Sequence, residues 1–379
     1  NNASKFKLII LWGEKGNGKT YTTHSVLREN NIKTKDIIFS DENMVSFEML
    51  GVSSSIHDED AILIEYSQFF REDYCLFFEN MELCDLDSLR ILYRLFKYHK
   101  NNDQKDSVIL EYNILEEPDD ILCSLSRDII FVRKPTRDEF YEYYASYFDS
   151  TPSNEKLFKK ILMITNGNIH NVFTTLNILQ YMDVLYKNGP KIAYNENSTY
   201  KLPNSLLDLY IDLFDGLKDY IREPLISAAP FSKQIYSTII RGIYHNYDRF
   251  EEYLKSLCEK GCFILENNEG FYKTSQFFLS HYCFSDECAR EAVISQISTE
   301  NAEQIVSKYY NQLDNLYSNK HIYNNLQDTD KLLLLSKLTK KRQNTLKINQ
   351  IHYIAELMEY YYERFMYLNV IKQGESLLE

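Results

Sequence analysis

The fold is decided by the stretch Gly13-Glu14-Lys15-Gly16-Asn17-Gly18-Lys19-Thr20. An apolar run at 6–12, short enough for one buried strand, comes directly before it, and a helical pattern follows at 21–29. The spacing G-x-x-x-x-G-K-T between a strand and a helix is that of a phosphate-binding loop, or P-loop. Glycines let successive backbone N–H groups curl around a phosphate without Cβ clashes. The helix that follows adds the positive end of its dipole, so the segment predicts a nucleotide site.

The motif gives individual residues their expected roles. Lys19 is expected to reach the β- and γ-phosphates of a bound nucleotide, and the Thr20 hydroxyl to ligate Mg²⁺. The predicted ligands are therefore ATP or ADP, with Mg²⁺. The predicted nucleotide-binding residues are Gly13, Glu14, Lys15, Gly16, Asn17, Gly18, Lys19, Thr20 and Tyr21.

A second acidic site is expected at the end of another buried strand, because P-loop ATPases hold the metal and the attacking water there. The apolar run at 74–78 is such a strand, and Glu79 and Asn80 follow it. Glu79 is the candidate magnesium residue, one methylene longer than an aspartate. Asn80 stands where a second acid would orient water, and a carboxamide cannot act as a base. Unless this is an ordinary strand end with a polar cap, the pair favours nucleotide binding over fast hydrolysis.

Further apolar runs alternate with helical patterns in the first third of the chain. Strands are expected at 36–40, 107–110 and 128–132, and helices at 61–70 and 86–100. This alternation predicts an α/β three-layer sandwich with a parallel sheet. The strand at 107–110 is expected to lie between the P-loop strand and the Glu79 strand. Asn113, just after it, is the candidate sensor of the γ-phosphate, and a simple loop residue is the alternative.

Other side chains are candidates for a functional role, and each also has an ordinary structural explanation. Arg127 and Arg133 flank the last of these strands and are candidates to reach the γ-phosphate of a neighbouring copy, although surface arginines do this rarely. The spacings Cys258-x3-Cys262 and Cys283-x4-Cys288 are looser than those of zinc sites. Thiols packed in an apolar core are the favoured interpretation of these cysteines.

Beyond Pro135 the pattern is mainly helical. One break at 166–168 interrupts the helices of 136–185, and the polar stretch 187–199 is interpreted as a linker. Helices resume at 204–259, and the alternating runs 262–265 and 271–273, joined by 267–270, predict a β-hairpin. Helices with such a hairpin are typical of a winged helix. From 285 onward the chain is helical again, with a long helix at 349–372 and another beginning at 374, as at the start of a helical repeat array.

Composition and charge narrow the classes of function. Lys and Arg number 42 and Asp and Glu number 55, a formal charge of −13, which disfavours a basic nucleic-acid cradle over most of the surface. Seven cysteines, an odd count, favour reduced thiols over a disulfide framework. We find neither a run of 18 apolar residues nor a secretory signal at the N-terminus. The expected location is the cytoplasm, with no membrane partner.

The order of these motifs resembles the STAND class of signalling P-loop ATPases, a branch of the AAA+ group, and within it the ATPase core of large LuxR-type bacterial regulators. Four segments besides the P-loop are similar to that subgroup. They are 76–85, similar to hhhDDhHWxD; 166–170, similar to the GNP-type turn of the lid; 202–206, similar to the LPxSL start of the winged-helix region; and 284–293, similar to FSHxxxREAV before the repeats.

The chain departs from that pattern at five positions. Glu79 and Asn80 replace two aspartates, and this makes weak or slow ATP hydrolysis the expectation. Glu82 replaces a histidine of the same segment. Ile169 replaces the proline of the lid turn, which would ordinarily contact the nucleotide, and Asp286 replaces a histidine.

The resemblance implies four domains and a nucleotide-gated switch. The domains are a P-loop domain at 1–134, a helical lid at 135–198, a winged helix at 199–298 and the start of TPR-like repeats at 299–379. ADP would hold the winged helix against the ATPase core. A protein or small-molecule signal at the repeats would allow nucleotide exchange and self-association. Transcription regulation would reach DNA only through a module outside this chain.

Two other functions stay open at this point. One is a scaffold whose nucleotide site is dead for hydrolysis. The other is an AAA+ DNA-associated ATPase, which the acidic balance and Asn80 disfavour.

Overall fold

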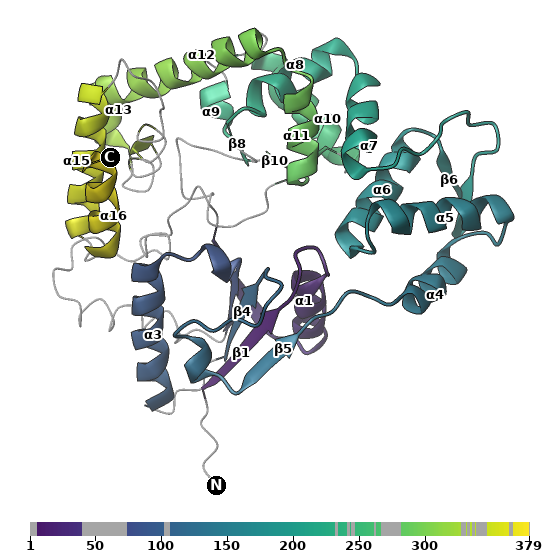
Figure 1. The fold of residues 1–379 in the computed structure, drawn as a ribbon, viewed down its shortest axis with the longest axis horizontal. Coiled ribbons are helices and arrows are strands. Elements are labelled where there is room, and N and C mark those ends of the chain that lie inside the picture. The colour runs from purple at the N-terminus through teal and green to yellow at the C-terminus, as the bar shows by residue number, and fades with distance from the viewer. Residues whose placement is uncertain are drawn as a thin grey trace. The chain divides into compact units, whose positions relative to one another are not determined.

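A computed structural model gives the fold shown in Figure 1. It describes residues 6–39, 74–101, 107–231, 234–240, 243, 247–260, 263–266, 282–326, 331, 334–335, 338, 347–363 and 367–378. The helix expected at 61–70 lies outside them. The chain forms two compact units, one within Asn1–Arg133 and Asp314–Glu379 and the other within Lys134–Asn268 and Phe277–Leu313.

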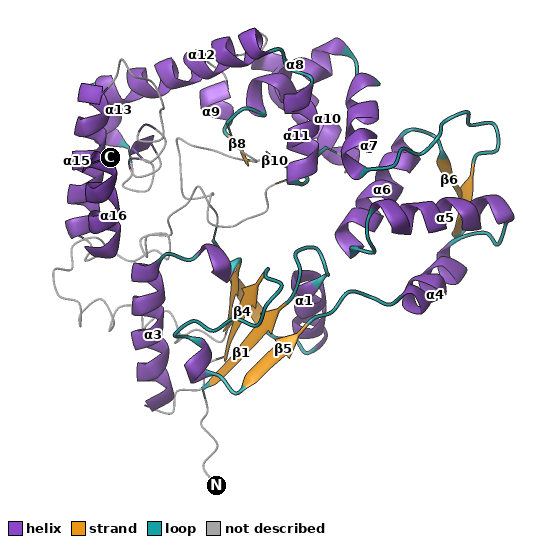
Figure 2. Cartoon of the chain, in the orientation of Figure 1, coloured by secondary structure: helices purple, strands orange, loops and turns teal. Residues whose placement is uncertain are grey.

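A five-stranded sheet organises the first unit (Figure 2). Its strands are β1 (Lys7–Trp12), β2 (Lys33–Ile38), β3 (Tyr74–Glu79), β4 (Ser107–Tyr112) and β5 (Asp128–Phe131). Their order is β2-β3-β4-β1-β5, and every neighbouring pair is parallel. The predicted parallel sheet is confirmed, as is the place of β4 between β1 and β3. The carboxyl ends of these strands share one edge, where ligands of open α/β sheets bind.

Alternation along the strands sends side chains to two cores. Leu76 and Phe78 of β3 join one core with helix α3 (Leu86–Asn101), while Phe77 joins the other with Leu27 of helix α1 (Lys19–Glu29). Because successive residues of a strand face opposite sides, the two helices cover opposite faces of the sheet. The three-layer arrangement predicted from the sequence is therefore present. The short turns η2 (Met81–Leu83) and η3 (Cys123–Leu125) follow β3 and precede β5.

Helices from the end of the chain complete the first unit. They are α13 (Lys320–Asn325), α15 (Lys347–Glu363) and α16 (Tyr367–Leu378). The Tyr317 hydroxyl donates to Glu356 of α15 at 2.7 Å, and the Tyr323 hydroxyl donates to the same carboxylate. The prediction of a new helix beginning at Gly374 is wrong, because α16 runs through it. A Cβ at Gly374 would lie 3.4 Å from Met358 Cε, an ordinary contact, so α16 passes through this position without needing a glycine.

The second unit begins with three helices and a hairpin. The helices are α4 (Arg137–Tyr147), α5 (Pro152–Ile164) and α6 (Ile169–Tyr181), and the hairpin pairs β6 (Leu185–Asn188) with β7 (Lys191–Tyr194). The linker predicted at 187–199 is therefore wrong over 187–194, whereas 195–199 have neither helix nor strand. Gly189 turns the hairpin at φ 61°, and the Asn154 side chain accepts a bond from the Tyr194 N–H at 2.7 Å. Because the strands of this hairpin are polar and are held by a hydrogen bond to a distant side chain, their composition resembles that of a linker.

The rest of the second unit combines helices with a small antiparallel sheet. Its elements are α7 (Leu206–Asp215), α8 (Asp219–Ala228), β8 (Gln234–Ile235), α9 (Ser237–Ile240), α10 (Tyr247–Lys260), β9 (Ile264–Glu266), β10 (Tyr282–Phe284), α11 (Glu287–Ser295) and α12 (Thr299–Ser318). The strand order is β8-β10-β9. The predicted strand at 271–273 and its turn at 267–270 lie outside the described residues, so that hairpin stays a prediction. Within the part that is described, no helix has the length and apolar character needed to cross a bilayer.

Candidate nucleotide-binding site

The P-loop joins β1 to α1 with three glycines at positive φ. Gly13, Gly16 and Gly18 have φ of 150°, 84° and 79°. A Cβ at Gly13 would lie 2.3 Å from the Val132 carbonyl oxygen, so no other residue fits there. Gly18 is the N-cap of α1 and supplies no side-chain cap. The first-turn N–H groups of α1 therefore lack the side-chain partner that usually satisfies one of them, as an anion-binding helix end requires.

The buried Lys19 side chain folds back over the loop. Its Nζ donates to the carbonyl oxygens of Gly13 and Glu14, each at 3.0 Å. Burial lowers the pKa of Lys19, and the charge of Glu111 opposes that shift. Asn17 is also buried, and its Nδ2 donates to the Val132 carbonyl at 3.5 Å. Tyr21 lies in the first turn of α1 and is 79% exposed, so only its backbone N–H is a candidate to contact phosphate.

Two carboxylates meet the Thr20 hydroxyl. That hydroxyl donates to Glu111 Oε2 at 2.8 Å and lies 3.4 Å from Glu79 Oε2. Glu79 ends β3 and Glu111 lies on β4, and the sheet brings them together because these strands are adjacent and parallel. A hydroxyl and two carboxylates are the hard oxygen donors that Mg²⁺ takes beside phosphates. The residues present therefore fit the metal that the P-loop implies.

Glu111 is the site residue that sequence reasoning missed. Its side chain is 3% exposed in a strand that reads Ser-Val-Ile-Leu-Glu-Tyr. Burial raises its pKa, while the Thr20 hydroxyl and the Lys19 charge lower it. The available signal was a lone charge in an apolar run, since a buried carboxylate is rare without a partner.

Asn80 and Asn113 pair with each other. Asn113 Nδ2 donates to Asn80 Oδ1 at 2.8 Å, and Asn80 Nδ2 donates to the Phe39 carbonyl at 3.0 Å. The Asn113 N–H donates to Glu82 at 2.9 Å. These bonds tie together the ends of β2, β3 and β4. In this arrangement both carboxamides hold strand ends, and their roles toward a nucleotide stay predictions.

The two candidate arginines lie at opposite ends of β5. Arg127 precedes β5, whereas Arg133 follows it, next to Val132. The Val132 N–H donates to the Trp12 carbonyl at 2.8 Å, so Arg133 is at the P-loop edge of the sheet. Of the two, only Arg133 is placed beside the nucleotide edge of its own unit.

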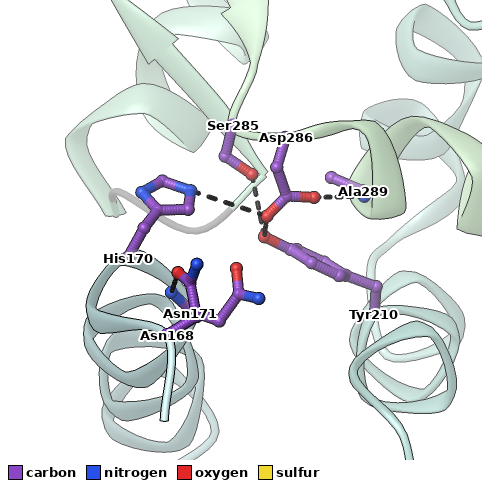
Figure 3. A network of polar contacts seen from close by, with 7 residues as sticks. All are labelled: Asn168, His170, Asn171, Tyr210, Ser285, Asp286 and Ala289. Carbon is purple, nitrogen blue, oxygen red and sulfur yellow. Dashed lines mark hydrogen bonds and ion pairs between the residues drawn. The ribbon is translucent and has the colours of Figure 1, made fainter. Parts of the chain in front are cut away.

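A separate polar network joins α6, α7 and α11 in the second unit (Figure 3). Asp286 caps α11, accepting from the Ala289 N–H at 2.8 Å, and also accepts from the Tyr210 hydroxyl at 2.8 Å. His170 lies in the first turn of α6, and its Nε2 is 3.8 Å from Asp286 Oδ2. Burial raises the pKa of Asp286, but the nearby His170 and the hydrogen bonds from the Ala289 N–H and the Tyr210 hydroxyl outweigh it and hold that pKa below its usual value. The network links the turn of 166–170 to the segment of 284–293.

The fold and the loop together define an α/β P-loop NTPase core. No protein-family model matches the chain, and no curated protein matches it. Similar solved structures include a Walker-type ATPase of Pyrococcus abyssi, 13% identical with a TM-score of 0.34, where the match covers 76% of this chain and 91% of that one.

Two further structures are similar over about half of this chain. A katanin structure, solved to explain katanin self-assembly, is 16% identical with a TM-score of 0.30, and the match covers 54% of this chain and 66% of that one. PCH-2 from C. elegans is 14% identical with a TM-score of 0.29, with 51% and 58% covered. This chain thus spans less than two thirds of the matched PCH-2 chain and about two thirds of the katanin chain. Because all three TM-scores lie below 0.5, the assignment of the core rests on the P-loop and the strand order.

Proposed function

We propose that the chain is an ATP- or ADP-binding signal-transduction switch with slow ATP hydrolysis, of the STAND type within the AAA+ group. One observation carries the proposal: the P-loop packs so closely on the Val132 carbonyl that only glycine fits at Gly13, and Thr20 faces two carboxylates. This arrangement supplies backbone donors for phosphates and oxygen donors for Mg²⁺. Lys19 would move from its carbonyl partners to the phosphates when nucleotide binds.

The second unit supports the switch part of the proposal. The element order α8, β8, α9, α10, β9, β10, with the three strands in the sheet order β8-β10-β9, supports the proposal of a winged helix in this unit. The His170–Asp286–Tyr210 network ties the proposed lid to this proposed winged helix, so we expect the two to move together. Asp286 stands where the resembling family has histidine, and here a lid histidine faces it.

The helical region beyond α11 is the proposed receiver of a signal. A nucleotide shifts a two-state equilibrium only by its differential affinity for the two states. Moving the population from 99:1 closed to 1:99 needs about 5.5 kcal/mol of differential binding free energy. We expect the contacts of one γ-phosphate and its Mg²⁺ to supply less than this. A protein or small-molecule signal at the helical region is therefore proposed as a second input. Self-association would follow, and DNA contact would occur only through a module outside this chain.

Solution scattering tests the switch. The full chain is expected to scatter as a closed monomer in ADP and in a non-hydrolysable ATP analogue, because neither nucleotide alone supplies the free energy for opening. An open oligomer in the analogue alone would overturn the two-input version. If Asp286→Asn, which keeps the cap of α11 and removes the charge facing His170, leaves the scattering unchanged in every ligand, the network is not part of the switch.

Hydrolysis gives a second prediction. Wild-type turnover is expected well below about 10 per second, because Asn80 has no carboxylate to polarise water. Glu111→Gln is expected to lower the residual turnover at least tenfold, since Glu111 is the buried carboxylate bonded to Thr20. Phosphate release measures both.

The matched control for hydrolysis is Glu116→Gln, which removes one exposed carboxylate just after β4. It should leave turnover unchanged. A fast wild-type enzyme, or equal turnover in Glu111→Gln and wild type, would show that Glu111 does not support hydrolysis.

A further inference from the structure

Three metal-ligating side chains gather on the α1 face of the sheet, one helical turn from Thr20. His24 lies four residues after Thr20 on α1, and residues four apart share a helix face. Asp36 on β2 pairs with Phe77 of β3, and Glu79 lies two residues beyond Phe77. Because side chains alternate along strands, Asp36 and Glu79 point to the same side of the sheet. The helix and the two strands thus bring His24, Asp36 and Glu79 together.

Their spacing suits a shared ion better than a direct bond. One ligand atom from each residue lies within 4.8 Å of the other two. His24 Nε2 and Asp36 Oδ2 are 3.6 Å apart, which is too long for a hydrogen bond. Two ligands bound tetrahedrally at about 2.1 Å from one ion are separated by about 3.4 Å. Binding one ion would therefore bring these atoms from separations of up to 4.8 Å to about 3.4 Å.

The residues around this cluster orient the His24 ring, and they give Asp36 Oδ1 no hydrogen-bond donor among the described residues. The His24 ring packs edge-on against Phe77, with centroids 5.2 Å apart, which fixes its orientation. Asp36 Oδ1 is buried and accepts no hydrogen bond from the described residues. Burial raises the pKa of Asp36, and the charge of His24 and a bond from Thr34 oppose it.

We propose that His24, Asp36 and Glu79 bind a divalent transition-metal ion of the zinc class, as a site separate from the P-loop magnesium site. One imidazole and two carboxylates suit such ions, whereas Mg²⁺ and Ca²⁺ take oxygen ligands alone. Three protein ligands leave a fourth position for water.

The two sites share Glu79, and this consequence rests on the proposed nucleotide function. Glu79 Oε2 lies 3.4 Å from the Thr20 hydroxyl, so Glu79 belongs to both groups. An ion on the His24 side draws this carboxylate away from Thr20. Zinc is therefore expected to weaken binding of Mg²⁺–ATP, and His24→Ala to remove that effect.

Calorimetric titration of the nucleotide-free full chain with Zn²⁺ tests the site, with visible absorption of bound Co²⁺ as the spectroscopic signature. Wild type is expected to bind one ion, and His24→Ala and Asp36→Asn are each expected to weaken binding at least tenfold. The matched control is His170→Ala, which removes the histidine of a similar pair, with Asp286 at 3.8 Å, that has no third ligand among the described residues. It should bind zinc as wild type does.

Three results would overturn the metal site. The first is a wild-type protein that shows no saturable Zn²⁺ binding, which would leave His24 and Asp36 as a simple ion pair. The second is a His24→Ala variant with the Zn²⁺ affinity of wild type. The third is a Co²⁺ spectrum with thiolate absorption, which would place the ion on cysteines. Binding of ADP by the same variants separates the two proposals. His24→Ala that binds ADP but not zinc supports the metal site, whereas wild type that binds zinc but no nucleotide overturns only the proposed switch.

Discussion

Replacing Lys19 with alanine is expected to weaken binding of ADP and ATP at least tenfold, which corresponds to about 1.4 kcal/mol. The Lys19 ammonium is buried and held at 3.0 Å from two loop carbonyls, directly where the P-loop would hold phosphates. Because the effective dielectric constant is lower at a buried site, this charge attracts a phosphate more strongly than it would in water. Its removal also takes a nearby cation from the buried Glu111. Calorimetry with Mg²⁺ present measures the affinity.

Lys15→Ala is the matched control for that experiment. Lys15 lies in the same loop and carries the same charge, but its side chain is exposed, so only its backbone N–H, which alanine keeps, is expected to bind phosphate. Its loss should change affinity by less than about threefold, because exposed charges are screened. Equal losses in the two variants would mean that general electrostatic attraction, not the P-loop lysine, binds nucleotide. Unchanged affinity in Lys19→Ala would place the nucleotide elsewhere.

The P-loop core was predictable because its signals are local. A short apolar run, a glycine-rich loop and a helix in that order leave few topologies, and the later runs at 74–78 and 107–110 complete the parallel sheet. Even the place of β4 between β1 and β3 followed, because the phosphate and acidic motifs need a strand between them. Local chemistry and long-range pairing agree in this part of the chain.

The missed features depend on contacts between distant residues. In the sequence Glu111 is only a polar residue near the end of a strand. Its role becomes visible when β3 and β4 pair and the Glu111 carboxylate accepts a hydrogen bond from Thr20. The hairpin at 185–194 reads as a linker because its strands are polar, and a distant side chain, Asn154, helps to hold it. The pairing of Asn80 with Asn113 needs the sheet register, which a strand pattern does not encode.

Gly13→Ala is expected to lower the free energy of unfolding of the first unit by about 3 kcal/mol and to abolish nucleotide binding. The added Cβ would lie 2.3 Å from the Val132 oxygen and 3.3 Å from its carbonyl carbon. Both are backbone atoms, which cannot rotate away as a side chain can. The Val132 N–H also donates to the Trp12 carbonyl at 2.8 Å, so relief of the clash would pull the chain after β5 away from the end of β1. Overpacking of this kind costs about 1–3 kcal/mol, and the positive φ adds about 1–2 kcal/mol.

Gly189→Ala separates the two costs. Gly189 also has positive φ, 61°, but a Cβ there meets nothing within 4 Å. Its substitution carries the backbone term alone and is expected to cost about 1 kcal/mol. Urea unfolding measures both variants, with fluorescence of Trp12, the single tryptophan, reporting on the first unit and circular dichroism on the whole chain. If Gly13→Ala costs no more than Gly189→Ala, the loop yields to a side chain, and the close approach of Gly13 to Val132 is not what shapes the phosphate site.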